Sequence, residues 1–140
     1  SVPNIYVGSE YLEHFYGESV KNYLDTCESK KISFSNDDEL EIICMPPWQI
    51  EKLDTKIDHF HNAASFVEMP INVIENYIKF IYKFNTSSIS LLSYSKFNLE
   101  TTMDPNNLIN FFKCKFTNYK YPYVIPKLKP DNYYFVSNIN

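Results

Sequence analysis

Arginine is absent from this 140-residue chain, and all 13 basic residues are lysine. Arginine is the side chain that most often makes bidentate contacts to phosphate or guanine. The formal net charge is −4, so a nucleic-acid partner is disfavoured. Glycine occurs only at Gly8 and Gly17. Two glycines so far apart cannot form the glycine-rich loop that holds phosphates in P-loop or dinucleotide-binding proteins.

Cysteine usage and hydropathy exclude further classes. The three cysteines, Cys27, Cys44 and Cys114, are odd in number and lack Cys-x-x-Cys spacing, which argues against a disulfide framework and a zinc site. No uncharged apolar run approaches the roughly 18 residues that a membrane span needs, and the N-terminus has no signal-peptide pattern. We therefore expect a reduced, cytoplasmic protein with no membrane partner, and we assign no metal ligand.

Helical and extended patterns alternate along the chain. Apolar residues make up 44% of it, enough for one core, and the length fits one domain. Alternating helices and strands predict βαβ units, so we expect an α/β fold with a mostly parallel sheet in which residues 1–140 form a single unit. Expected helices cover 3–16, which Gly17 ends, 70–84 and a segment from 104, with one or two turns at 49–53; expected strands cover part of 20–39, then 41–45, 57–64, 88–94 and 133–138, and 119–130 is expected to be a loop.

The clearest expected helix covers residues 70–84. Its isoleucines recur at a spacing of three and four residues, which places them on one face. That face is typical of a helix packed against a core. Its predicted members are Ile71, Ile74, Ile78 and Ile81.

Polar side chains gather where the strand expected at 57–64 ends. In open α/β sheets, ligands bind outside the carboxyl ends of the strands. Asn62, Ser65 and Glu68 would therefore be offered to a ligand. For Glu68 an alternative stays open, because a carboxylate beside the start of the next helix also stabilises the positive end of that helix.

Two histidines belong to the same strand. Side chains alternate along a strand, so His59 and His61 share one face, while Asp58, Phe60 and Asn62 share the other. The pair could pack under a helix with a backbone partner, one ring could serve as a general base or substrate contact, or both could share a metal.

The only tryptophan, Trp48, follows Pro46-Pro47 at the end of an expected strand. An aromatic ring at this position could stack on an adenine or another flat ring. The alternative is that it fills the edge of a core.

Three segments together resemble the sugar O-methyltransferase family, whose members are S-adenosylmethionine-dependent class I methyltransferases. The similarity is spread over residues 4–117 and is densest at 47–77. The segments are Asn4-Ile-Tyr-Val-Gly-Ser-Glu-Tyr-Leu, Pro47-Trp48-Gln49-Ile50-Glu51-Lys52-Leu53 and Asp58-x-Phe60-x-Asn62-x-x-Ser65-Phe66-x-Glu68-Met69.

The resemblance implies a Rossmann-like sheet with flanking helices and methyl transfer from S-adenosylmethionine to a sugar hydroxyl. The loop of residues 45–48 would border the adenine, with Met45, Pro47 and Trp48 as cofactor-binding residues. His61 is the nearest candidate for the base that accepts the hydroxyl proton. The resemblance also places the polar side chains beyond this strand at the reaction cleft: Glu68 as a second catalytic residue, and Asn62 and Ser65 as substrate-binding residues.

The chain departs from the family at the cofactor site. Such methyltransferases carry a glycine-rich loop after the first strand and an acidic residue at the end of the second, and neither is present here. We therefore expect the incomplete C-terminal part of a longer enzyme. The rival interpretation is a non-enzymatic α/β module that binds a partner or forms a homo-oligomer through unpaired sheet edges.

Overall fold

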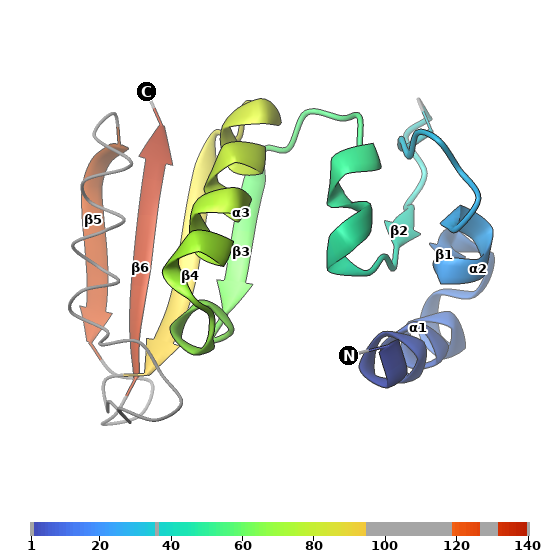
Figure 1. Cartoon of the computed structure of the whole chain (residues 1–140), viewed down its shortest axis with the longest axis horizontal. Helices are drawn as coiled ribbons and strands as arrows, with labels where there is room; N and C mark the ends of the chain where they lie inside the picture. The colour runs from blue at the N-terminus through green and yellow to red at the C-terminus, as the bar shows by residue number, and fades with distance from the viewer. Residues whose placement is uncertain (1, 36, 95–118, 127–131, 140) are drawn as a thin grey trace. The chain divides into compact units, whose positions relative to one another are not determined.

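The computed structural model describes residues 2–35, 37–94, 119–126 and 132–139. Contacts within the chain divide it into two compact units, Ser1–Thr55 and Lys56–Asn140, here called the first and the second unit. Each combines helices with a small sheet, which confirms the predicted α/β class (Figure 1). That the two units belong to a single domain stays a prediction.

The first unit begins with the long helix predicted from the sequence. Helix α1 ends where Gly17 adopts φ +55°, a left-handed conformation that glycine reaches without steric cost. Strands β1 and β2 form a parallel pair. β2 is shorter than the strand expected at 41–45, and both of its residues are half-buried. The elements are α1 (Val2–Tyr16), η1 (Gly17–Ser19), β1 (Val20–Lys21), α2 (Tyr23–Thr26), β2 (Ile42–Ile43) and the 3₁₀ helix η2 (Pro47–Lys52).

A buried amide connects two of these elements. Gln49 in η2 is 1% exposed, and its Nε2 donates to the carbonyl oxygen of Thr26 in α2 at 3.0 Å. The hydroxyl of Thr26 lies 3.4 Å from Gln49 Oε1. The sequence predicted the turns of η2 but not α2, which a capping box between Asn22 and Asp25 starts.

The second unit is built on a four-stranded sheet in the order β3-β4-β6-β5. β3 and β4 pair in parallel, whereas β6 runs antiparallel to both β4 and β5. β3, β4 and β5 therefore share one direction, and only β6 is reversed. The elements are β3 (His59–Ala63), η3 (Phe66–Glu68), α3 (Ile71–Lys83), β4 (Ser88–Tyr94), β5 (Tyr119–Pro126) and β6 (Asn132–Ile139).

Helix α3 covers one face of this sheet at β3 and β4 (Figure 1). Three of its four predicted inward residues are buried, but Ile71 is 48% exposed because it occupies the first position of the helix. The helix ends at Lys83 and is capped by Phe84, and Asn85 then turns the chain at φ +52°. The core consists of Phe66, Val67, Ile74, Ile78, Ile81, Ile89 and Leu91.

The prediction of a loop at 119–130 is wrong for residues 119–126, which form β5. Pro122 and Pro126 suggested the loop, since proline cannot donate to a ladder of hydrogen bonds. β5 lies at the edge of the sheet, and its register shifts between Lys120 and Tyr123. Both features make proline acceptable in a strand. The helix that was expected to begin at residue 104 lies outside the described residues. Cys114 lies outside them as well.

Candidate functional site

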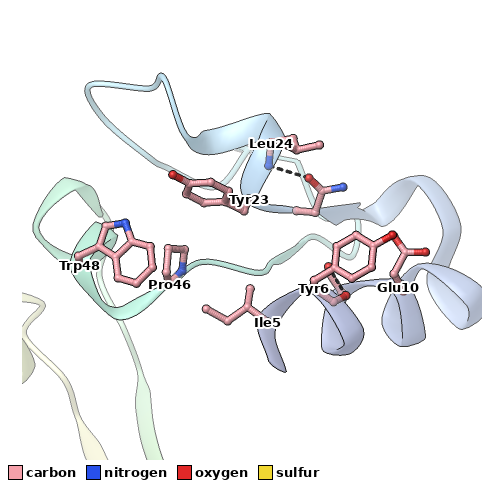
Figure 2. Close-up of a pocket in the computed structure, with 9 residues that line it drawn as sticks. Ile5, Tyr6, Glu10, Tyr23, Leu24, Pro46 and Trp48 are labelled. Carbon is pink, nitrogen blue, oxygen red and sulfur yellow. Dashed lines mark hydrogen bonds between the residues drawn. The ribbon is translucent and has the colours of Figure 1, made fainter. Parts of the chain in front are cut away.

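The first unit contains a cavity of about 530 Å³, which is within the size range of small-molecule sites. Its wall is mostly apolar and combines α1, the start of α2 and the start of η2. Figure 2 shows Trp48 and Tyr23 at one end and Tyr6 with Glu10 at the other. The lining residues are Ile5, Tyr6, Ser9, Glu10, Asn22, Tyr23, Leu24, Pro46 and Trp48.

Aromatic rings at this cavity are exposed instead of packed in a core. Trp48 is 58% exposed and Tyr6 is 63% exposed. The rings of Tyr23 and Trp48 meet edge to face, with centroids 6.4 Å apart and an interplanar angle of 77°. Trp48 thus does not fill a core edge, and more than half of its surface is accessible to a ligand.

The polar part of the wall is held by bonds within the chain. Asn22 Oδ1 accepts from the backbone N–H of Leu24 at 2.8 Å, and its Nδ2 donates to Glu13 Oε1 at 2.9 Å. Ser9 is buried, and its hydroxyl donates to the carbonyl oxygen of Tyr6 at 2.9 Å. These bonds fix α1 and the start of α2, so the cavity is preformed.

Of the three residues predicted to bind a cofactor, Met45, Pro47 and Trp48, one lines this cavity. Trp48 lines it, and so does the buried Pro46. Met45 and Pro47 flank Pro46 without being among the lining residues. The chain between β2 and the first turn of η2 therefore contributes Pro46 and Trp48 to the cavity.

In the second unit, Asn62 and Ser65 are brought together at the exit of β3. Asn62 is buried, its Nδ2 donates to Ser65 Oγ at 2.6 Å, and its Oδ1 accepts from the backbone N–H of Phe66 at 3.1 Å. Between them Ala64 adopts φ +62°, a strained conformation that tends to occur at functional sites. The Asn62 amide braces this turn.

Glu68 lies beyond that turn, at the end of η3, and is exposed. Its backbone N–H donates to the carbonyl oxygen of Ser65 at 3.1 Å. A backbone hydrogen bond therefore joins Glu68 to the turn that the Asn62 side chain holds. Its predicted catalytic role stays a prediction.

The two histidines of β3 lie on one face of the sheet, as predicted, and join a network with two serines of β4. His59 Nδ1 is 2.6 Å from Ser88 Oγ, and His59 Nε2 is 2.7 Å from Ser90 Oγ. His61 Nδ1 is also 2.7 Å from Ser90 Oγ. Ser88 Oγ further donates to the carbonyl oxygen of Asp58 at 3.1 Å. The two rings thus share one buried hydroxyl, that of Ser90.

The sequence reasoning missed both serines and the two tyrosines of the cavity. A signal for the serines exists, because Ser88 and Ser90 repeat at the same two-residue spacing as His59 and His61. In the parallel pair β3–β4 they are register partners, His59 with Ser88 and His61 with Ser90. The tyrosines come from separate segments, and no local pattern joins them.

Metal binding, thiol chemistry and membrane insertion find little support in the part of the chain that is described. No group of three or more His, Cys, Asp or Glu side chains lies together there as a metal site would require. Burial, and secondarily the charge of Glu13, raises the pKa of Cys44, so its thiol stays protonated and is a poor nucleophile at neutral pH. Within the same residues, every helix is too short or too polar to cross a membrane.

Comparisons with protein-family models, with curated proteins and with solved structures found no match.

Proposed function

We propose that this chain takes part in O-methyl transfer from S-adenosylmethionine to a sugar hydroxyl, as the C-terminal part of a cytoplasmic class I methyltransferase with a Rossmann-like sheet. The observation that carries the proposal is the aromatic cavity of the first unit. It includes Trp48, the residue that the family resemblance places beside the adenine.

The chemistry of the cavity supports this ligand. The exposed side chain of Trp48 and its edge-to-face contact with Tyr23 would provide a platform for a purine ring. Glu10, at the opposite end, is the one charged side chain among the lining residues that the structure describes. Its carboxylate suits ribose hydroxyls or a cationic sulfonium group. The ligand would therefore lie with its base toward Trp48.

The sheet of the second unit supports the acceptor site. Because β3, β4 and β5 share a direction, their carboxyl ends lie at one edge, where open α/β sheets bind ligands. A reversed strand such as β6 is common in otherwise parallel sheets of doubly wound folds. His61 and Asn62 are the two residues before Ala63, which ends β3 at this edge.

When bound, S-adenosylmethionine supplies an electrophilic methyl group. The chain must hold the acceptor oxygen in line with that group and accept one proton. We assign proton acceptance to His61, with Glu68 as the second catalytic residue. Ser65, positioned by Asn62, would contact the sugar.

The cavity is tested by titrating S-adenosylmethionine into the chain and following the fluorescence of its single tryptophan. Stacking of a base on an aromatic ring contributes about 1–3 kcal/mol, so Trp48→Ala, measured by calorimetry, should weaken binding about tenfold or more. Phe15→Ala is the control, because Phe15 is equally exposed on α1 and is not a lining residue. Absence of binding, or equal affinity in both variants, would refute the proposal.

A second function, self-association through a sheet edge, rests on β3. Of the two outer strands of the four-stranded sheet, β5 contains Pro122 and Pro126, which discourage edge pairing. β3 contains no proline. Size-exclusion chromatography with light scattering separates the two functions, since a discrete oligomer that ignores S-adenosylmethionine would favour the association module.

A further inference from the structure

One end of the cavity in the first unit combines a carboxylate with an aromatic ring. Tyr6 and Glu10 are four residues apart in α1, and residues at this spacing lie on the same face of a helix, one turn from each other. Both line the cavity, and Figure 2 shows them at the end away from Trp48. The two side chains therefore belong to the same part of the wall.

Two further polar side chains of the wall are uncharged and already bonded within the chain. The hydroxyl of Ser9 donates to the carbonyl oxygen of Tyr6, and Asn22 is bonded both to Glu13 and to the backbone of α2. No lysine is among the lining residues that the structure describes. Glu10 is therefore the charge that this wall presents to a ligand.

A carboxylate next to an aromatic ring favours a cation over a neutral hydrogen-bond donor. The carboxylate attracts positive charge, and the face of a tyrosine ring attracts it too, through the quadrupole of the ring. Proteins recognise quaternary ammonium ligands by such rings. The apolar side chains around them, such as Ile5 and Leu24, lower the local dielectric constant and strengthen the attraction.

We propose that Glu10 and Tyr6 form a subsite for an organic cation and thereby make the cavity selective for a charged methyl donor over the neutral thioether that remains after transfer. The choice of S-adenosylmethionine as that donor rests on the proposed function. The inference decides between two roles of Glu10, since the sulfonium belongs only to the donor, whereas the ribose is common to donor and product. Glu10 is thus a specificity-determining residue and takes no part in the chemistry.

The change of charge follows from the reaction. The acceptor oxygen forms a bond to the methyl carbon, and the bond from that carbon to sulfur breaks with both of its electrons remaining on sulfur. The sulfonium thereby becomes a neutral thioether, and the hydroxyl proton passes to the base. The attraction to Glu10 and Tyr6 is then lost, so the product, S-adenosylhomocysteine, should leave more readily than the donor.

The selectivity is measured by calorimetric titration of the chain with S-adenosylmethionine and with S-adenosylhomocysteine. An exposed ion pair and a contact between a cation and a ring each change affinity by up to about fivefold. The parent chain should therefore bind the donor about fivefold or more tightly than the product in low salt, and this ratio should shrink in high salt. Equal affinities for the two ligands would overturn the proposal.

Glu10→Gln tests the carboxylate. It keeps a hydrogen-bond acceptor of similar size and removes the charge, so the donor should bind about threefold more weakly while the affinity for the product stays the same. An equal loss for both ligands would mean that Glu10 holds the ribose, and it would overturn the proposal. Glu18→Gln is the matched control, because it removes the same charge from an exposed residue that does not line the cavity, and the ratio should not change.

Tyr6→Leu tests the ring. It keeps an apolar side chain but removes the quadrupole, so the ratio of the two affinities should fall about twofold or more. Tyr11→Leu is the control, because Tyr11 is 65% exposed on the same helix and is not a lining residue. Circular dichroism checks that each variant is folded. Equal ratios in the two variants would remove Tyr6 from the subsite.

A smaller probe separates failure of this inference from failure of the proposed function. Trimethylsulfonium carries the positive sulfur without base or ribose, and tert-butanol has a similar size and no charge. In ¹⁵N–¹H spectra of the chain, trimethylsulfonium should shift the amide signals of Tyr6 and Glu10 more than tert-butanol does, and Glu10→Gln should abolish the difference. That result without binding of S-adenosylmethionine would keep the cation subsite and refute the proposed function. Binding of S-adenosylmethionine with equal responses to the two probes would keep the function and refute the subsite.

Discussion

The two compact units are stabilised by different kinds of contact. The second unit buries an aliphatic face of α3 on β4, with Ile74 and Ile89 both 0% exposed. The first unit connects short helices through a buried amide, Gln49, and leaves Trp48 and Tyr6 exposed around a cavity. Apolar side chains are thus packed into a core in the second unit, whereas apolar surface remains accessible to a ligand in the first unit.

This difference indicates that the two units have different roles. A close-packed layer of helix on sheet holds the side chains of β3 and β4 rigidly, as a catalytic network requires. A preformed cavity with accessible aromatic rings suits recognition of a planar ligand. Substitutions that remove apolar volume should therefore affect the second unit most, and loss of polar partners should affect the first.

The largest expected effect is that of Ile74→Ala in the second unit. The side chain is fully buried in the core, so its truncation should lower the free energy of unfolding by about 2–5 kcal/mol. Urea denaturation followed by circular dichroism measures the change.

Ile71→Ala is the matched control, one turn earlier on the same helix and 48% exposed. It should change stability by no more than about 0.5 kcal/mol. Equal losses in the two variants would mean that the buried face of α3 is not what stabilises the second unit.

An intermediate effect is expected for Gln49→Met in the first unit. The apolar side chain fills similar space but removes one of the two hydrogen bonds to the carbonyl oxygen of Thr26, which keeps the backbone N–H of Ser29 as a donor. The loss of one buried hydrogen bond costs about 0.5–1.5 kcal/mol. Trp48 belongs to the same 3₁₀ helix, so its fluorescence reports the transition.

Glu51→Met, an exposed position of η2, serves as the comparison and should cost about 0.5 kcal/mol or less. If Gln49→Met were as stable as the parent chain, polar contacts would not be what holds the first unit together.

The sequence predicted the second unit better than the first, and the reason is the length of each pattern. α3 repeats its isoleucines over three turns, and Ser88–Tyr94 is a continuous strand pattern, so periodicity identified both. α2 is too short to show a period, and the strand expected at 41–45 is only two residues long in the structure. β5 was missed because its prolines are tolerated only at an edge, and edge position is a property of the whole sheet.

The candidate site of the second unit was likewise predicted better from the sequence than the cavity of the first unit. Strand alternation placed His59 and His61 on one face, as the structure confirms. Asn62 and Ser65 were both expected where this strand ends, and the structure shows that they are hydrogen-bonded there. The partner of the histidines, Ser90, depends on the register between two strands. The cavity required three separate segments to meet, which no local pattern encodes.

The smallest expected effect is electrostatic and concerns Glu41. Like Gln49, this residue makes polar contacts between segments of the first unit. Its carboxylate is paired with Lys21 and accepts from the backbone N–H and hydroxyl of Ser35 at 2.6 and 3.0 Å. The hydrogen bond from Lys21, followed by that from the Ser35 backbone, holds the pKa of Glu41 below its ordinary value. The charged form is thus favoured in the folded state.

A carboxylate whose pKa is lowered by folding contributes stability that is fully present above the ordinary glutamate pKa of about 4.3. This contribution is lost as the pH falls through the lower folded value. Lys21 is half exposed, so the contribution should stay below about 1 kcal/mol and shrink in high salt. Glu41→Gln should flatten the acid side of the stability profile recorded by Trp48 fluorescence, whereas Glu28→Gln, at an exposed position of the same unit, should leave it unchanged. Identical profiles for the two variants would show that the first unit depends on its uncharged hydrogen bonds and not on this ion pair.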